Sequence, residues 1–138
     1  MGVGKVLVVD DNAYARQAVG LLLTKAGYDV VEAEDGAQAI QVMASEDHAS
    51  DIDTVICDLD MPTMNGSQTL SYFKAHYPLI PLIILTGAPD FVLTDVLAKQ
   101  GITDYLLKPV SEKRLLETVR VNVRLHELRQ RQGGGISG

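Results

Sequence analysis

The sequence predicts an α/β fold built on a doubly wound parallel sheet of five strands. Two observations lead to this prediction. Short apolar runs alternate along the 138 residues with segments whose apolar residues recur at helical spacing. The runs are also continuous in Val, Ile and Leu, which is typical of strands that helices cover on both faces.

Five segments are predicted as strands. Four are strongly apolar and are expected to be buried, and they cover residues 5–10, 51–58, 81–86 and 104–109. The fifth, residues 28–33, is half polar and suits the edge of a sheet. Each strand is followed by a helix, so the chain is expected to form a flavodoxin-like (βα)5 fold with strand order 2-1-3-4-5.

The helices are predicted from apolar residues three or four positions apart. These positions are Ala18, Leu21 and Leu22 in the first helix, Ala37, Ile40 and Met43 in the second, Leu70 and Phe73 in the third, and Phe91, Val92 and Val96 in the fourth. Asn12 is expected to cap the start of the first helix, and Gly27 and Gly101 the ends of the first and fourth.

The last helix is predicted to begin after Ser111, a good capping residue, and to run to about Gln132. Such a helix is about 33 Å long, more than a strand of five or six residues needs for cover, so it should overhang the domain. The sequence therefore predicts one domain over residues 1–132 and a flexible tail or linker over 133–138.

Composition favours a cytoplasmic protein. Cys57 is the one cysteine, so no internal disulfide can form, and no apolar run approaches the roughly 20 residues that cross a bilayer. No signal peptide is recognisable, and no membrane contact is expected. The net charge is −6, but residues 111–132 carry six Lys or Arg against three Glu, which leaves the rest at −9. An acidic body argues against direct nucleic-acid binding.

Ionic and hydroxyl side chains stand where the central strands end. Ligands of open parallel sheets bind at the carboxyl ends of the strands, so these side chains should lie close together. They are Asp10 and Asp11 after the first strand, Asp58 with Asp60 after the third, Thr86 after the fourth and Lys108 after the fifth.

Carboxylates gathered at one edge repel one another unless a cation lies among them. Asp10, Asp11, Asp58 and Asp60 offer only oxygen ligands, which favours a hard ion such as Mg²⁺. Lys108 can pair with Asp58 and then with a phosphoryl oxygen. The site is therefore predicted to stabilise an anion beside a carboxylate nucleophile.

The segments VLVVDDN, VICDLDMPTMNG, IILTGA and YLLKP resemble the signature segments of response-regulator receiver domains (CheY-like) of two-component signal transduction. The resemblance covers about residues 5–125. It implies a cytoplasmic phosphoprotein domain that is not an enzyme beyond its own phosphorylation and dephosphorylation. Its partners would be a sensor histidine kinase or phosphotransfer protein, which supplies the phosphoryl group, and a downstream output domain or partner protein.

The resemblance also implies roles for single residues. Asp58 corresponds to the phospho-accepting aspartate, and Asp10 and Asp11 to the acidic pair that holds Mg²⁺. Thr86 corresponds to the switch hydroxyl, and Tyr105 to the aromatic residue that responds to it and changes the face of the fourth helix, fifth strand and fifth helix. Lys108 matches the lysine of the family motif, and the bond to Pro109 is a candidate for a cis peptide.

An alternative is a Mg²⁺-dependent aspartyl phosphatase of the haloacid-dehalogenase type, because Asp58 and Asp60 resemble its nucleophile and acid/base pair. Such enzymes need further acids on a strand after the lysine, whereas Glu112 and Glu117 follow on a predicted helix. A receiver fold that binds partners without phosphorylation is a third reading, disfavoured because every ionic position is present.

Two further expectations concern the end of the chain and the histidines. Val121, Leu125 and Leu128 form a second apolar stripe on the last helix, which suits a homodimer, a connection to an output module, or a solvated extension. His48, His76 and His126 share no ligand spacing and are predicted at the surface.

Overall fold

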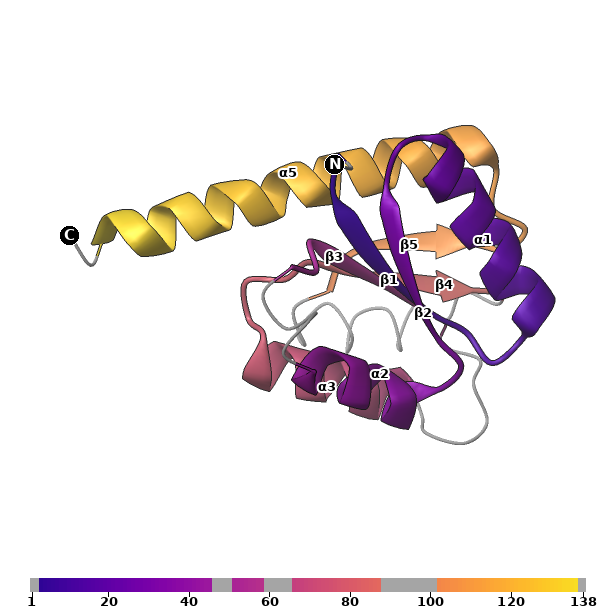
Figure 1. Ribbon diagram of the computed structural model, residues 1–138, viewed down its shortest axis with the longest axis horizontal. Helices are drawn as coiled ribbons and strands as arrows, with labels where there is room; N and C mark the ends of the chain where they lie inside the picture. The colour runs from indigo at the N-terminus through magenta and orange to yellow at the C-terminus, as the bar shows by residue number, and fades with distance from the viewer. Residues whose placement is uncertain (1–2, 46–50, 59–65, 88–101, 137–138) are drawn as a thin grey trace.

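The computed structural model describes residues 3–45, 51–58, 66–87 and 102–136, and Figure 1 shows their arrangement. The strands are β1 (Lys5–Val9), β2 (Asp29–Ala33), β3 (Thr54–Asp58), β4 (Leu82–Thr86) and β5 (Ile102–Leu107). The helices are α1 (Ala13–Lys25), α2 (Gly36–Ala44), α3 (Gly66–His76) and α5 (Glu112–Ile136). The strands form one parallel sheet in the order β2-β1-β3-β4-β5, which confirms the predicted fold.

Two layers of helix enclose the sheet. Helices α1 and α5 lie on one face, and α2 and α3 lie on the other (Figure 1). Alternate residues of β1 therefore enter different cores: Leu7 and Val9 pack with Phe73 on the α3 side, whereas Val6 and Val8 pack with residues of α1 and α5. Every residue of β3 and β4 is buried, as continuous apolar strands predict.

Strand β5 differs from its prediction. It begins at Ile102 and ends at Leu107, whereas residues 104–109 were expected, and of its residues Leu106 alone is fully buried. The reason is its place in the sheet, since β5 is an edge strand like β2. Its apolar composition therefore does not translate into burial.

Helix α1 ends as the sequence indicates. Gly27 has φ 100°, the Gly27 N–H donates to the Thr24 carbonyl and the Tyr28 N–H donates to the Leu23 carbonyl, which is the Schellman arrangement. At its start, Asn12 Oδ1 accepts from the Ala15 N–H at 3.0 Å. The predicted buried face of α1 is wrong in part, because Leu21 is 62% exposed while Val19 and Leu23 are buried.

Helix α5 begins after Ser111, whose Oγ accepts from the Arg114 N–H at 3.1 Å. It continues to Ile136, beyond the predicted end near Gln132, and extends past the sheet (Figure 1). The reading of residues 133–138 as a flexible tail stays a prediction. None of the helices in the described ranges is long and apolar enough to cross a membrane.

Some expectations fall outside the described residues. These are the fourth helix with Phe91, Val92 and Val96, its end at Gly101, and the positions of Asp60 and His48.

Candidate functional site

Three carboxylates meet where β1 and β3 end. The two strands are neighbours with Val9 opposite Cys57, so the residues that follow, Asp10 and Asp58, reach the same edge. Asp10, Asp11 and Asp58 each place one carboxylate oxygen within 4.8 Å of the others. Asp10 and Asp58 are 1% and 2% exposed, whereas Asp11 is exposed. The predicted convergence of these three acids is therefore present.

Burial makes the charge of Asp10 unfavourable. Removal from water raises the pKa of Asp10 from 3.8 to about 6. The hydrogen bond that Asp10 Oδ1 accepts from the Asn12 N–H, at 2.9 Å, opposes this change, and the neighbouring charge of Asp58 adds to it. A cation bound beside Asp10 would lower the pKa of this carboxyl group again.

The cluster fits a hard divalent cation. Asp10 Oδ2 is buried and accepts no hydrogen bond from the described part of the chain, although a carboxylate oxygen in that position normally has a partner. The three possible metal ligands in this cluster are all carboxylate oxygens. Two of them belong to the buried residues Asp10 and Asp58, and the third belongs to the exposed Asp11. Mg²⁺ commonly takes one or two carboxylates and keeps several waters, and this set of ligands allows that.

Lys108 reaches the cluster from the adjacent side. Its Nζ lies 2.8 Å from Asp58 Oδ2, and its side chain is 32% exposed against 3% for Asp58. The Lys108 N–H donates to the Thr86 carbonyl at 2.9 Å, which fastens the end of β5 to the end of β4. The Lys108–Pro109 peptide bond is cis, as expected. An ammonium held at 2.8 Å is thus in place to share its charge with another anion.

Thr86 and Tyr105 differ in exposure. Thr86 is the last residue of β4 and is 7% exposed, whereas Tyr105, in the middle of β5, is 46% exposed. The Tyr105 ring lines a groove of about 370 Å³ together with Leu107, Pro109, Val110, Ser111 and Arg114. The structure thus has a buried hydroxyl at the acidic edge and an aromatic ring on the outer surface of β5.

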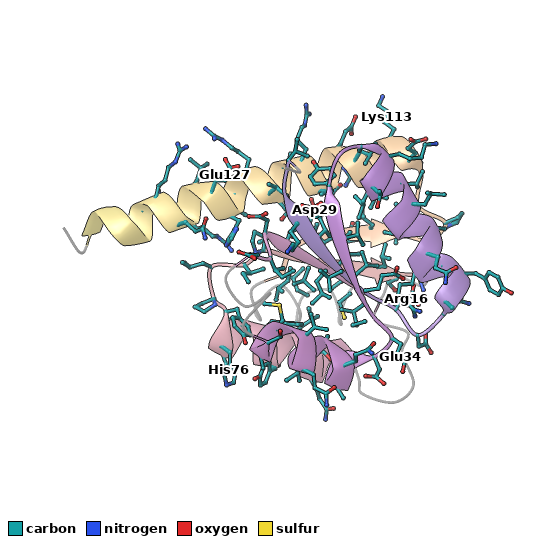
Figure 2. The ribbon with its side chains drawn as sticks, viewed as in Figure 1. Arg16, Asp29, Glu34, His76, Lys113 and Glu127 are labelled. Atoms are coloured by element: carbon teal, nitrogen blue, oxygen red, sulfur yellow. The ribbon has the colours of Figure 1, made fainter. Side chains whose placement is uncertain are left out.

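Two neighbours complete the site. Arg16, labelled in Figure 2, donates from Nη1 to the Asp10 carbonyl at 2.8 Å and from Nε to Glu32 Oε1 at 2.9 Å. Sequence reasoning did not single out Arg16, because both partners are distant in the chain or belong to the backbone. Cys57 is fully buried, and burial, followed by the charge of Asp58, raises the pKa of its thiol to about 12. It is a core residue, as predicted.

Comparison with known sequences identifies relatives of this chain. The Response regulator receiver domain family matches residues 6–120. The chain is 37% identical over 117 residues to the transcriptional regulatory protein GlrR of Escherichia coli K12 and 34% identical over 117 residues to the response regulator protein FleR of Pseudomonas aeruginosa. Each alignment covers 83% of this chain but 25% and 24% of those proteins. The chain thus spans about a quarter of these curated relatives.

Solved structures agree. A response regulator receiver domain protein from Clostridium thermocellum matches with a TM-score of 0.84 at 29% identity, over 91% of this chain and 98% of that one. The signal receiver domain of an HD domain-containing protein from Pseudomonas fluorescens matches with a TM-score of 0.82 at 31% identity, over 90% and 97%. With the family match over residues 6–120, these findings show that the chain belongs to the response regulator receiver domain family of two-component phosphorelay signalling.

Proposed function

We propose that this domain accepts a phosphoryl group on Asp58 from the phosphohistidine of a sensor histidine kinase or phosphotransfer protein. The observation that carries the proposal is the Asp58 carboxylate itself. It is buried at the carboxyl edge of the sheet, 2.8 Å from an ammonium and beside two further acids. Membership of the receiver family supports the same assignment.

In the proposed reaction an Asp58 carboxylate oxygen bonds to phosphorus while the phosphorus–nitrogen bond of the donor breaks. The imidazole leaves with the electron pair of that bond and takes up a proton. Lys108, already 2.8 Å from Asp58, balances charge on the transferred oxygens, and the Thr86 hydroxyl donates to one of them. Asp10 and Asp11 would hold Mg²⁺ together with Asp58 and Asp60, and the ion would neutralise further negative charge.

Incubation with acetyl phosphate and Mg²⁺ tests this assignment. Intact-mass spectrometry is expected to show one added phosphoryl group, absent in Asp58→Asn and strongly reduced in Asp11→Asn or with EDTA. Asp29→Asn, at an exposed acid that begins β2, is the matched control and should phosphorylate normally. An adduct that persists in Asp58→Asn would contradict the assignment. Many turnovers of a small phosphomonoester would favour the aspartyl phosphatase instead.

The signal is proposed to leave through Tyr105. The Tyr105 side chain is partly exposed on β5. Movement of the Thr86 hydroxyl toward a phosphoryl group would vacate space that the Tyr105 ring could enter, and phosphorylation would thereby shift the population between two conformations. This would alter the face formed by the fourth helix, β5 and α5. Ring resonances of Tyr105 should change on phosphorylation, and Thr86→Ala should weaken that change while leaving Asp58 phosphorylated.

The partners follow from the same reading. Because the chain spans a quarter of relatives such as GlrR, we propose that an output domain or partner protein receives the signal, without contact between this domain and nucleic acid. Homodimer formation through Val121, Leu125 and Leu128 stays a prediction. Those residues line a groove of about 570 Å³ with Arg120 and Arg124, and sedimentation velocity would show whether copies associate.

A further inference from the structure

Helix α5 buries a row of polar side chains against the sheet. Thr118, Asn122 and His126 are four residues apart, so they lie one above another on the helix, and they are 2%, 2% and 3% exposed. His126 was predicted at the surface, and its burial corrects that prediction. We call Thr118, Asn122 and His126 the polar row. It lies beside an apolar row of the same spacing, Leu115, Val119 and Val123.

Asn122 connects the polar row to β5. Its Oδ1 accepts a hydrogen bond from the Thr103 hydroxyl, which also lies 3.0 Å from the Leu82 carbonyl. Its Nδ2 donates to the Thr118 carbonyl at 2.8 Å, within the helix. The Thr118 Oγ1 is buried and has no hydrogen-bond partner in the described ranges.

His126 connects the polar row to the segment that leads into β3. Its Nδ1 lies 3.0 Å from Asp53 Oδ1, and the other oxygen of Asp53 accepts from the Lys5 N–H at 2.8 Å. The Lys5 Nζ lies 3.8 Å from Asp51, so a second acid stands nearby. One helix residue is thereby joined to the beginnings of both β1 and β3.

The burial pattern of α5 runs against its hydropathy. Val121 is 59% exposed and Leu128 42% exposed, while Asn122 and His126, next to or near them in the chain, are buried. Burying a polar side chain costs free energy unless it is hydrogen-bonded, and an apolar side chain that stays exposed adds no hydrophobic stabilisation. Apolar burial alone therefore does not explain why α5 has this rotation about its axis.

The apolar row also leaves the axial position of α5 weakly defined. Leu115, Val119 and Val123 repeat every four residues, so a slide of about one turn, roughly 5 Å, would return an apolar side chain to two of the three places. That slide would break the hydrogen bonds of Asn122 to Thr103 and of His126 to Asp53 as they stand. Thr118 or His126 would take the place of Asn122, and Asn122 or Gln130 the place of His126, and these side chains differ in length and shape from the ones they replace.

We propose that the polar row is a register lock, which fixes the rotation and axial position of α5 on the sheet and keeps Val121 and Leu128 outside. Buried polar contacts can specify one arrangement among several of similar stability. The lock acts on the helix that overhangs the domain, so it sets where the end of α5 points. This inference does not depend on phosphorylation of Asp58.

Spin labels can test the lock directly. Nitroxides on Gln17→Cys in α1 and Gln130→Cys in α5 occupy exposed positions, and α1 lies at the opposite end of the molecule from the free end of α5 (Figure 1). Cys57 can stay in place, since its buried thiol will not react. Pulsed electron paramagnetic resonance then measures the distribution of distances between the two labels. The protein with the wild-type polar row should give one narrow maximum.

The variant Asn122→Leu/His126→Leu makes the row apolar. It should lose the single narrow maximum and gain a second one displaced by about one turn, roughly 5 Å. The matched control is Arg124→Leu/Glu127→Leu, which removes an exposed ion pair of 3.0 Å and adds the same two leucines. Figure 2 shows Glu127 on the outer side of α5. The control should keep the narrow maximum.

An unchanged distribution in the double variant would overturn the proposal. Should the double variant fail to fold, Asn122→Leu alone decides, because the Thr103 hydroxyl keeps the Leu82 carbonyl as its acceptor. This single variant should unfold within a few degrees of the wild type and show a broadened distribution. If it too fails to fold, the row supplies stability rather than register, and the proposal is wrong.

Discussion

Replacing Asp10 by Asn should stabilise the metal-free domain at neutral pH. The carboxylate is 1% exposed, and its pKa is raised from 3.8 to about 6, chiefly by burial. Between these values the folded state binds more protons than the unfolded state, so stability falls as pH rises from about 4 to about 6. This difference in pKa corresponds to a loss of at most about 3 kcal/mol in the free energy of unfolding at pH 7.5.

The substitution keeps the local hydrogen bond and removes the charge. Asn Oδ1 can still accept from the Asn12 N–H, and the new Nδ2 occupies the place of Asp10 Oδ2, which has no partner in the described ranges. A gain of about 2 to 3 kcal/mol would raise the melting temperature by roughly 5 to 10 °C for a domain of this size.

The assay is thermal and urea unfolding at pH 4.5, 6 and 7.5 in EDTA. Asp10→Asn should exceed the wild type at pH 7.5 and approach it at pH 4.5, and Mg²⁺ should stabilise the wild type more than the variant. Asp29→Asn is the control, since that acid is exposed at the other end of the sheet. A variant that is less stable than the wild type at pH 7.5, or a gap that does not close on acidification, would refute this electrostatic account.

Three further substitutions and one reagent test other parts of the structure. Lys108→Ala should fold but lose about 1 to 2 kcal/mol in urea unfolding, because the ion pair of 2.8 Å between Lys108 and the buried Asp58 is removed, and phosphorylation should no longer alter partner affinity; unchanged coupling would count against the role of the lysine. Gly20→Ala should stabilise α1 by up to about 1 kcal/mol, since the new methyl group would meet one side-chain atom at 3.5 Å, whereas Gly27→Ala, at φ 100°, should destabilise by about 1 kcal/mol, and equal melting temperatures would contradict both expectations. Iodoacetamide at pH 8 should leave Cys57 unmodified until urea unfolds the domain, as peptide mass spectrometry would show, and rapid alkylation of the native protein would mean that the thiol is accessible.

The strand order and the acidic edge could be predicted because both follow from local patterns and one geometric rule. Continuous apolar runs give parallel strands, and parallel strands bring the residues after them, such as Asp10 and Asp58, to one edge. Arg16 could not be found in this way, since its partners are a backbone carbonyl and an acid on another strand. The contact depends on the assembled fold.

His126 shows a second limit of sequence patterns. Spacing searches look for ligand sets, and His126 has no second histidine nearby, so the surface was the expected place. Its burial depends on Asp53, 73 positions earlier in the chain. Similarly, Leu21 is apolar and at helical spacing but faces solvent, because α1 turns Val19 and Leu23 toward the sheet.

The length of α5 makes it a lever. Helix α5 continues for ten residues after His126, to Ile136, which is about 15 Å of helix that extends past the sheet (Figure 1). A tilt of about 10° at the root, small enough for packed side chains to absorb, would sweep the far end through roughly 3 Å by simple geometry of that length of helix. A small tilt of α5 within the domain would thus produce a larger displacement at Ile136, where a bound or attached partner could detect it.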